Sequence, residues 1–125
     1  SSPRTIPEDV YRRHMERARD TGNYFLFFRC YMDIMSHDAT IVLQSLLNLG
    51  QHKNKDGWIL CTVEYLKKDA RFERDAQTRI LAELEGLGII EWSKFGVPPR
   101  RHVRIDIVRI EQLLDKFQST GNPVE

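Results

Sequence analysis

The stretch that decides the fold is residues 77–107, which read QTRILAELEGLGIIEWSKFGVPPRRHVRIDI. Apolar residues recur at helical spacing in its first third, which predicts an amphipathic helix. Gly88 follows the last of them, where a helix commonly ends on a residue in the left-handed conformation. The period then changes to two in two separate runs, which predicts a β-hairpin. The apolar members of these runs are Ile90, Trp92, Val103, Ile105 and Ile107.

The predicted loop of this hairpin, residues 95–101, combines turn formers with two arginines. Between Glu91 and Arg109 there are five basic residues against two acidic ones, whereas between Thr62 and Gly88 there are five against six. Positive charge is therefore concentrated in the hairpin, although the net charge of the chain is only +1. Because nucleic-acid binding depends on such local basic surfaces, the hairpin is the stronger candidate for it than the preceding helix.

Length and composition indicate one globular domain. The chain has 125 residues, of which 41% are hydrophobic and 30% charged, as in ordinary soluble proteins. No apolar run approaches the roughly 20 residues of a membrane span, and the polar N-terminus is unlike a signal peptide. We therefore expect a cytoplasmic protein, nucleoid-associated if bacterial or phage, with no membrane partner. Cys30 and Cys61 lack CxxC spacing, which predicts buried, reduced thiols.

The N-terminal part of the chain is predicted to be an extension of the main domain. Residues 1–23 are expected to form a polar tail and a helix from Pro7 to about Arg19, residues 24–118 the main domain and residues 119–125 a flexible tail. The helix has few apolar residues, so it packs by a narrow stripe or touches a second chain. The aromatic run Tyr24–Phe28 is predicted to be an extended segment, buried in the fold or in a dimer interface because its exposure would promote aggregation. A homodimer through this helix and this run is one expected assembly.

The main domain is predicted to be α+β and mainly helical. A buried helix follows Ser36 and ends near Gly50, and Trp58–Leu60 forms a very short strand. Thr62 caps a further helix, and Phe72 fills the turn before the helix of residues 77–87. After the hairpin, Ile110–Phe117 is expected to be a short closing helix. Trp58 and Trp92 are expected to fill the core of the small sheet, with a role as stacking platforms as the alternative.

The element order from residue 36 onward resembles winged helix-turn-helix domains. TVEYLKKDA (62–70) is similar to the first helix of that motif, and LAELEGLGII (81–90) is similar to the end of its recognition helix. The stretch IMSHDATIVL (34–43), followed by Gly57-Trp58, looks most like the variant in plasmid and phage replication initiators and primosome proteins. The resemblance covers about residues 24–108. In two places the chain departs from the family pattern, with Glu73 at the expected helix cap and Ala76-Gln77 in place of Thr-Val.

This resemblance implies a three-helix core, an antiparallel hairpin wing, and N- and C-terminal helical extensions. It also implies double-stranded DNA as the partner, with the second motif helix in the major groove and the wing on the phosphate backbone. With Ile80 at the centre of the buried face, Arg74, Thr78 and Arg79 lie opposite it. Arg79 could instead pair locally with Asp75 or Glu83. The candidate DNA-binding residues are Lys68, Arg71, Arg74, Thr78, Arg79, Lys94, Arg100, Arg101 and Arg104.

Two functions are compatible with these observations. The first is DNA binding in replication initiation or transcription regulation. The alternative is a winged helix that acts as a protein–protein assembly module without DNA binding, for a replication or regulatory partner, which suits the acidic recognition helix. No enzyme activity, metal or cofactor is expected, because the sequence has no phosphate-binding glycine loop and its histidines lack metal-ligand spacing. These histidines are His14, His37, His52 and His102.

Overall fold

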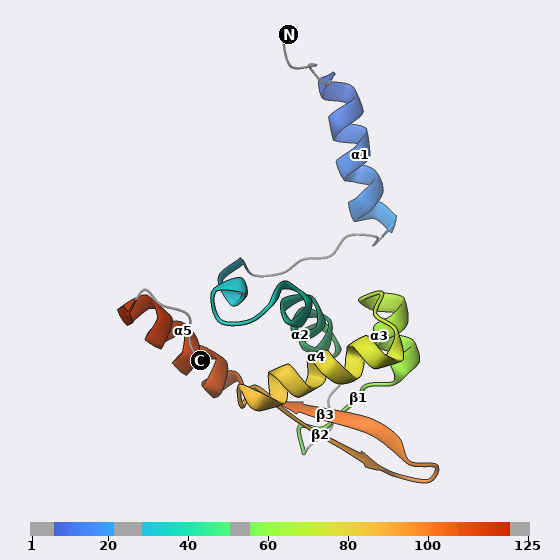
Figure 1. Cartoon of the computed structure of the whole chain (residues 1–125). Helices are drawn as coiled ribbons and strands as arrows, with labels where there is room; N and C mark the ends of the chain where they lie inside the picture. The colour runs from blue at the N-terminus through green and yellow to red at the C-terminus, as the bar shows by residue number, and fades with distance from the viewer. Residues whose placement is uncertain (1–6, 22–28, 51–55, 121–125) are drawn as a thin grey trace.

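A computed structural model describes residues 7–21, 29–50 and 56–120 of the chain (Figure 1). The described part is mainly helical, with five α-helices and one three-stranded sheet. The predicted α+β class is confirmed. The elements in order are α1 (Glu8–Thr21), the 3-10 helix η1 (Arg29–Asp33), α2 (His37–Leu49), β1 (Ile59–Leu60), α3 (Val63–Asp69), α4 (Arg74–Gly86), β2 (Ile90–Phe95), β3 (Arg100–Ile105) and α5 (Ile107–Thr120).

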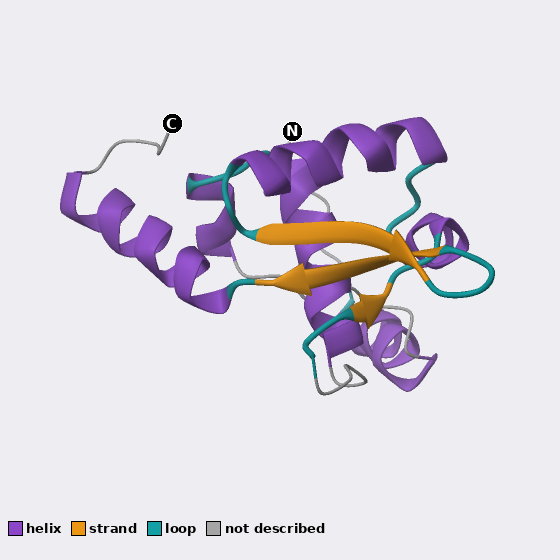
Figure 2. Ribbon diagram, turned by 90° about the horizontal axis from the view of Figure 1, so that it is seen from below, coloured by secondary structure: helices purple, strands orange, loops and turns teal. Residues whose placement is uncertain are grey.

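The three strands form an antiparallel sheet in the order β1-β3-β2. Val103 in the central strand lies opposite both Ile59 of β1 and Trp92 of β2. Since side chains alternate between the faces of a sheet, Ile59, Ile90 and Val103 share one face, and all three are buried. In Figure 1 the helices α2, α3 and α4 lie on one side of the sheet. Figure 2 shows the same strands as one twisted layer.

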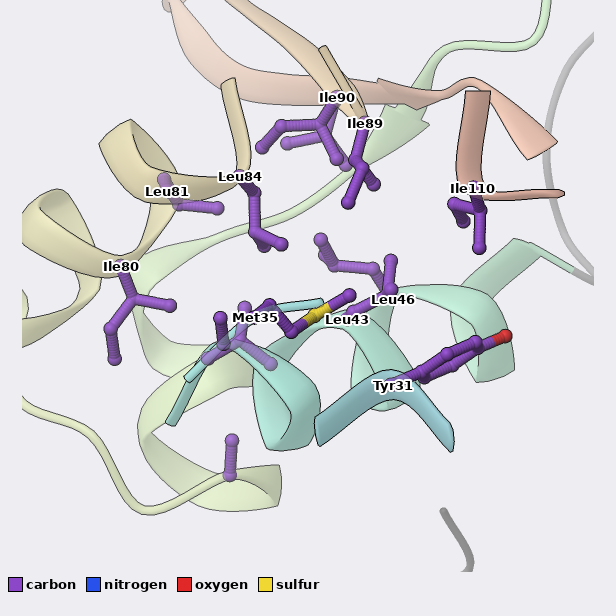
Figure 3. Close-up of a cluster of buried hydrophobic side chains, with 14 of the residues drawn as sticks. Tyr31, Met35, Leu43, Leu46, Ile80, Leu81, Leu84, Ile89, Ile90 and Ile110 are labelled. Carbon is purple, nitrogen blue, oxygen red and sulfur yellow. The ribbon is translucent and has the colours of Figure 1, made fainter. Parts of the chain in front are cut away.

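The core lies between this inner sheet face and the helices. Leu43 and Leu46 of α2 and Ile80 and Leu84 of α4 are fully buried and point toward one another (Figure 3). Ile110 of α5 joins them from the other end of the sheet. Burial of one such side chain contributes about 1.5–3 kcal/mol relative to leaving it exposed, so this cluster holds α4 and the sheet in a fixed relation.

Local signals in the sequence set the ends of these helices. The hydroxyl oxygens of Ser36 and Thr62 accept hydrogen bonds from Ala39 N and Tyr65 N, both at 3.1 Å. The predicted N-cap of α3 is therefore confirmed, and Ser36 caps α2 at the helix start that the sequence predicts. Gly88 has a φ of +79° after α4, and Ile89 N donates to Leu84 O at 3.0 Å. This is the left-handed stop that the sequence predicts.

The hairpin and the last helix differ from expectation at their ends. Both strands run further into the predicted loop, so that only residues 96–99 form the turn. Ile107 continues the alternating pattern of β3 but is the first residue of α5. The reason is the side chain of Asp106, whose Oδ1 accepts a hydrogen bond from Arg109 N at 3.0 Å, as an N-cap does. The prediction that α5 begins at Ile110 is therefore wrong.

Four residues predicted to be buried can be compared with the structure. Cys61 is buried and reduced as predicted, but Cys30 is exposed, so the prediction of two buried thiols is half wrong. Trp92 is 38% exposed, which contradicts its predicted role in the core. Trp58 is partly buried. Trp92 is exposed because α4 diverges from the hairpin at this position.

The N-terminal helix is present where the sequence predicts it, and in Figure 1 it stands apart from the other helices. Its apolar residues Val10, Tyr11 and Met15 are exposed. The extended segment predicted for Tyr24–Phe28 lies outside the described residues. Within the described ranges, no helix is both long and apolar enough to cross a membrane.

Candidate nucleic-acid interface

A groove of about 500 Å³ opens between the first half of α4, the start of α3 and the hairpin of β2 and β3. It exists because α4 and β2 meet at the turn containing Gly88 and then diverge, so the hairpin tip stands clear of the helix (Figure 1). The residues that line the groove are Thr62, Val63, Glu64, Arg74, Thr78, Leu81, Trp92, Lys94, Pro99, Arg100 and Arg101.

Three exposed cations line this groove. Arg74 comes from the first turn of α4, and Lys94 and Arg100 come from the two strands of the hairpin. None of the three forms an ion pair within the part of the chain that the structure describes. Glu64 is the acidic residue among those that line the groove. Grouped charges of one sign in a concave surface attract a partner of opposite charge.

Other cations are already paired within the fold. Arg79 lies 3.5 Å from Asp38 at the start of α2, rather than pairing with Asp75 or Glu83 as local spacing suggested. Arg104 contacts Glu91 at 2.7 Å and lies over the Trp58 ring, 4.7 Å from its centroid. The carboxylate of Glu83 instead accepts hydrogen bonds from the backbone N and the hydroxyl of Ser36. Part of the acidic charge of α4 therefore serves the contact between α4 and α2.

Arg101 belongs to the groove wall but makes internal hydrogen bonds. Its Nε donates to Cys61 O at 2.9 Å, and its Nη2 donates to Gln77 Oε1 at 2.7 Å and to Thr62 O at 3.3 Å. The Gln77 side chain is fully buried, and its Nε2 donates to Val63 O and Phe72 O. The guanidinium thus connects the hairpin with both α3 and α4, a structural role that its sequence position beside Arg100 does not reveal.

The remaining predicted residues divide by location. Thr78 is exposed in the groove, and its hydroxyl donates to Arg74 O at 3.1 Å. Lys68 and Arg71 are exposed at the end of α3 and in the following turn, outside the residues that line the groove. The structure therefore brings together five of the predicted residues: Arg74, Thr78, Lys94, Arg100 and Arg101.

Ring contacts brace the hairpin on its other face. Phe95 and His102 stack with centroids 3.9 Å apart and planes at 13°. Trp58 meets Phe95 edge to face at 5.5 Å. These contacts connect the far end of the hairpin to the segment before β1, so the position of Lys94 and Arg100 relative to α4 is supported from both faces of the sheet.

Two observations bear on other chemistry. Burial raises the pKa of the Cys61 thiol, and the nearby Arg101 guanidinium only partly opposes this shift. A thiol with a raised pKa is a poor nucleophile at neutral pH. Among the residues that the structure describes, no group of three or more His, Cys, Asp or Glu side chains could hold a metal ion.

Two solved structures resemble this chain over almost its whole length. One, described as "Structure of Rep-DNA complex", aligns with a TM-score of 0.53 at 14% identity, covering 98% of this chain and 100% of the other. Another, described as "N-Terminal domain of DNA binding protein", aligns with a TM-score of 0.52 at 14% identity, covering 100% and 99% of the two chains. The fold is a winged helix-turn-helix. The predicted resemblance is thus confirmed for the fold.

In this winged helix, α3 and α4 are the helix-turn-helix, and β2, β3 and their turn are the wing. The groove described above is therefore the space between the second motif helix and the wing. The sequence matches no protein-family model, and no curated protein is significantly similar to it.

Proposed function

We propose that this chain binds double-stranded DNA through the groove between α4 and the wing. The observation that carries the proposal is the grouping of Arg74, Lys94 and Arg100 around that groove, with no ion-pair partner among the described residues. Phosphate contacts from lysine and arginine supply most of the affinity in non-specific DNA binding. The names of the two similar structures, which mention DNA, agree with this assignment.

In the proposed mode, the first half of α4 enters the major groove and the wing follows the backbone. Arg74 and Thr78 reach base edges or phosphates from the helix, while Lys94 and Arg100 reach phosphates from the wing. Lys68 and Arg71, exposed beside the motif, would add phosphate contacts at the flank. The setting is replication initiation or transcription regulation, which the sequence resemblance implies.

Three predicted residues have a different role in this mode. Arg79 can join the interface by exchanging its exposed carboxylate partner for a phosphate, which costs little because exposed ion pairs contribute only about 0–1 kcal/mol. Arg104 lies over the Trp58 ring on the face of the sheet opposite the groove, so it would reach a phosphate only outside the groove. Arg101 acts by holding the wing against α3 and α4, since its guanidinium donates hydrogen bonds to Cys61 O, Thr62 O and Gln77 Oε1.

The proposal is tested by titrating labelled duplex DNA at several salt concentrations. If several phosphates are contacted, log affinity should fall against log salt with a slope of roughly −3 to −5. Alanine at Arg74, Lys94 or Arg100 should each reduce the magnitude of the slope by about 0.9. Arg29→Ala is the matched control, because Arg29 is exposed on η1 and does not line the groove.

Absence of salt-sensitive binding at low ionic strength would overturn the proposal. The alternative, a winged helix that binds protein without binding DNA, would then be the better account. Equal loss of slope in Arg29→Ala and Arg100→Ala would show that binding depends on overall charge and not on this groove.

We also propose that the chain forms a homodimer through its N-terminal region. The observation that favours it is the exposure of Tyr11 and Met15, at 59% and 48%, on α1. A dimer would present two winged helices to two half-sites. Sedimentation equilibrium should show a dimer that Tyr11→Glu with Met15→Glu converts to a monomer, whereas Arg12→Ala on the polar side leaves it intact. A monomeric wild-type protein would refute this assembly.

A further inference from the structure

On the inner face of the sheet, the side chain of Trp92 is not fully covered by the helices. Its neighbours on that face, Ile90 and Val103, are 2% and 0% exposed, whereas Trp92 is 38% exposed. Because α4 diverges from the hairpin, the indole lines the groove with Leu81 of α4 and Pro99 of the wing turn. A large aromatic surface is thus presented at the site where the unpaired cations gather.

The indole also has a free hydrogen-bond donor. Tryptophan Nε1–H can only donate, and no acceptor in the described part of the chain receives it. The groove therefore offers an apolar ring and a neutral donor beside the cationic side chains of Arg74, Lys94 and Arg100. A partner that matches this combination has an apolar surface and anionic oxygens within one short unit, as the sugar and phosphate of a nucleotide have.

We propose that the indole of Trp92 contacts the deoxyribose–phosphate backbone of one strand of duplex DNA in this groove. The inference rests on the proposed DNA binding and deepens it. The ring packs against the sugar, and Nε1–H donates to an oxygen of a phosphate that the surrounding cations neutralise. In a duplex the bases are stacked inside, and extruding one costs a few kcal/mol, so the backbone is the part of the strand that meets this wall.

The contact can be observed with Trp92 as the only tryptophan. The Trp58→Phe variant keeps an aromatic ring against Phe95 and leaves Trp92 as the fluorophore. Addition of duplex DNA should shield Trp92 from acrylamide quenching. In the reciprocal variant, Trp92→Phe, the remaining Trp58 lies outside the residues that line the groove, and its quenching should change much less.

Affinity measurements separate the two parts of the contact. Trp92→Phe keeps a ring but loses the donor, and should weaken duplex binding about tenfold, the effect of losing one hydrogen bond to a charged group. Trp92→Ala should weaken it further. Neither change should alter the salt slope, because the indole is uncharged, and Trp58→Phe should bind as the wild type does. Thermal unfolding of each variant establishes that the loss is not due to unfolding.

Three results would overturn the inference. In the first, DNA binds with the expected salt dependence while quenching of Trp92 is unchanged, and then the proposed function stands without this contact. In the second, a single strand of the same length binds more tightly and shields Trp92 more, which would indicate stacking on bases. In the third, no DNA binds at all in the titration of labelled duplex, and the proposed function has then failed together with the contact.

Discussion

The guanidinium of Arg101 donates a hydrogen bond to Gln77 Oε1 across 2.7 Å, which connects the wing to the buried side of the second motif helix. Gln77 in turn donates to Val63 O in the first turn of α3 and to Phe72 O in the turn after it. Two polar residues thus join three elements at one point. The angle between α4 and the wing, and with it the width of the groove, depends on this connection.

Removal of Arg101 should therefore destabilise the fold, unlike removal of its neighbour. Arg101→Ala leaves the fully buried Gln77 Oε1 without its donor, and an unsatisfied buried polar group costs about 1–3 kcal/mol. Arg100→Ala removes an exposed side chain and should stay within about 0.5 kcal/mol of wild type. Urea denaturation measures both values. Equal midpoints for the two variants would contradict the structural role of Arg101.

The comparison of Arg100 with Arg101 shows what the sequence could predict. The helix, the stop at Gly88 and the two strands follow from local periodicity, so the fold could be predicted from residues 77–107. Because Ile80 is buried, Arg74 lies on the opposite, exposed face of α4, and the hairpin places Arg100 near its tip. The sequence could therefore predict that both arginines lie near one groove. The alternation of residues along β3, however, does not predict the hydrogen bond between the guanidinium of Arg101 and Gln77.

Trp92 could not be placed from the sequence for a different reason. Trp92 lies on the same face of β2 as Ile90, but its burial depends on the length over which α4 contacts the sheet. The tertiary packing of α4 on α2 sets this length, and no local sequence signal gives it. Ile107 shows the converse case, since the nearby Asp106 side chain begins a helix where the apolar pattern favours a strand.

The contact between Ser36 and Glu83 should contribute to stability. The carboxylate accepts from Ser36 N at 2.9 Å and from Ser36 Oγ at 2.8 Å, which joins α4 to the start of α2. Glu83→Ala should lower the free energy of unfolding by about 1–3 kcal/mol, since hydrogen bonds to a charged group contribute about that much. Glu85→Ala, at an exposed position of the same helix, is the control and should have little effect. Similar losses in both variants would mean that the contact with Ser36 is not the cause.

Tyr65 should titrate later than an ordinary tyrosine. Burial raises its pKa to about 12, and the negative charge of Asp69 adds to the shift. Because the folded-state pKa lies above the unfolded value of 10.0, this contribution to stability is complete below pH 10 and is lost as pH rises toward 12. In a difference absorbance titration, the wild type should show a tyrosinate transition near pH 12 that is absent from Tyr65→Phe. A missing transition near pH 10 would contradict the shift.

Two glycines near the end of α4 should respond to alanine in opposite directions. Gly88 has a φ of +79°, and a Cβ there would lie 3.3 Å from Arg109 Nε, so alanine is both strained and crowded. Gly88→Ala should therefore destabilise the protein by about 1–2 kcal/mol. Gly86 lies within α4 with nothing within 4 Å of an added Cβ, and Gly86→Ala should stabilise it by about 0.5–1 kcal/mol through helix propensity. Thermal unfolding of the two variants in parallel measures both effects. A shift of the same sign in both would mean that the backbone conformation at Gly88 is not what ends α4.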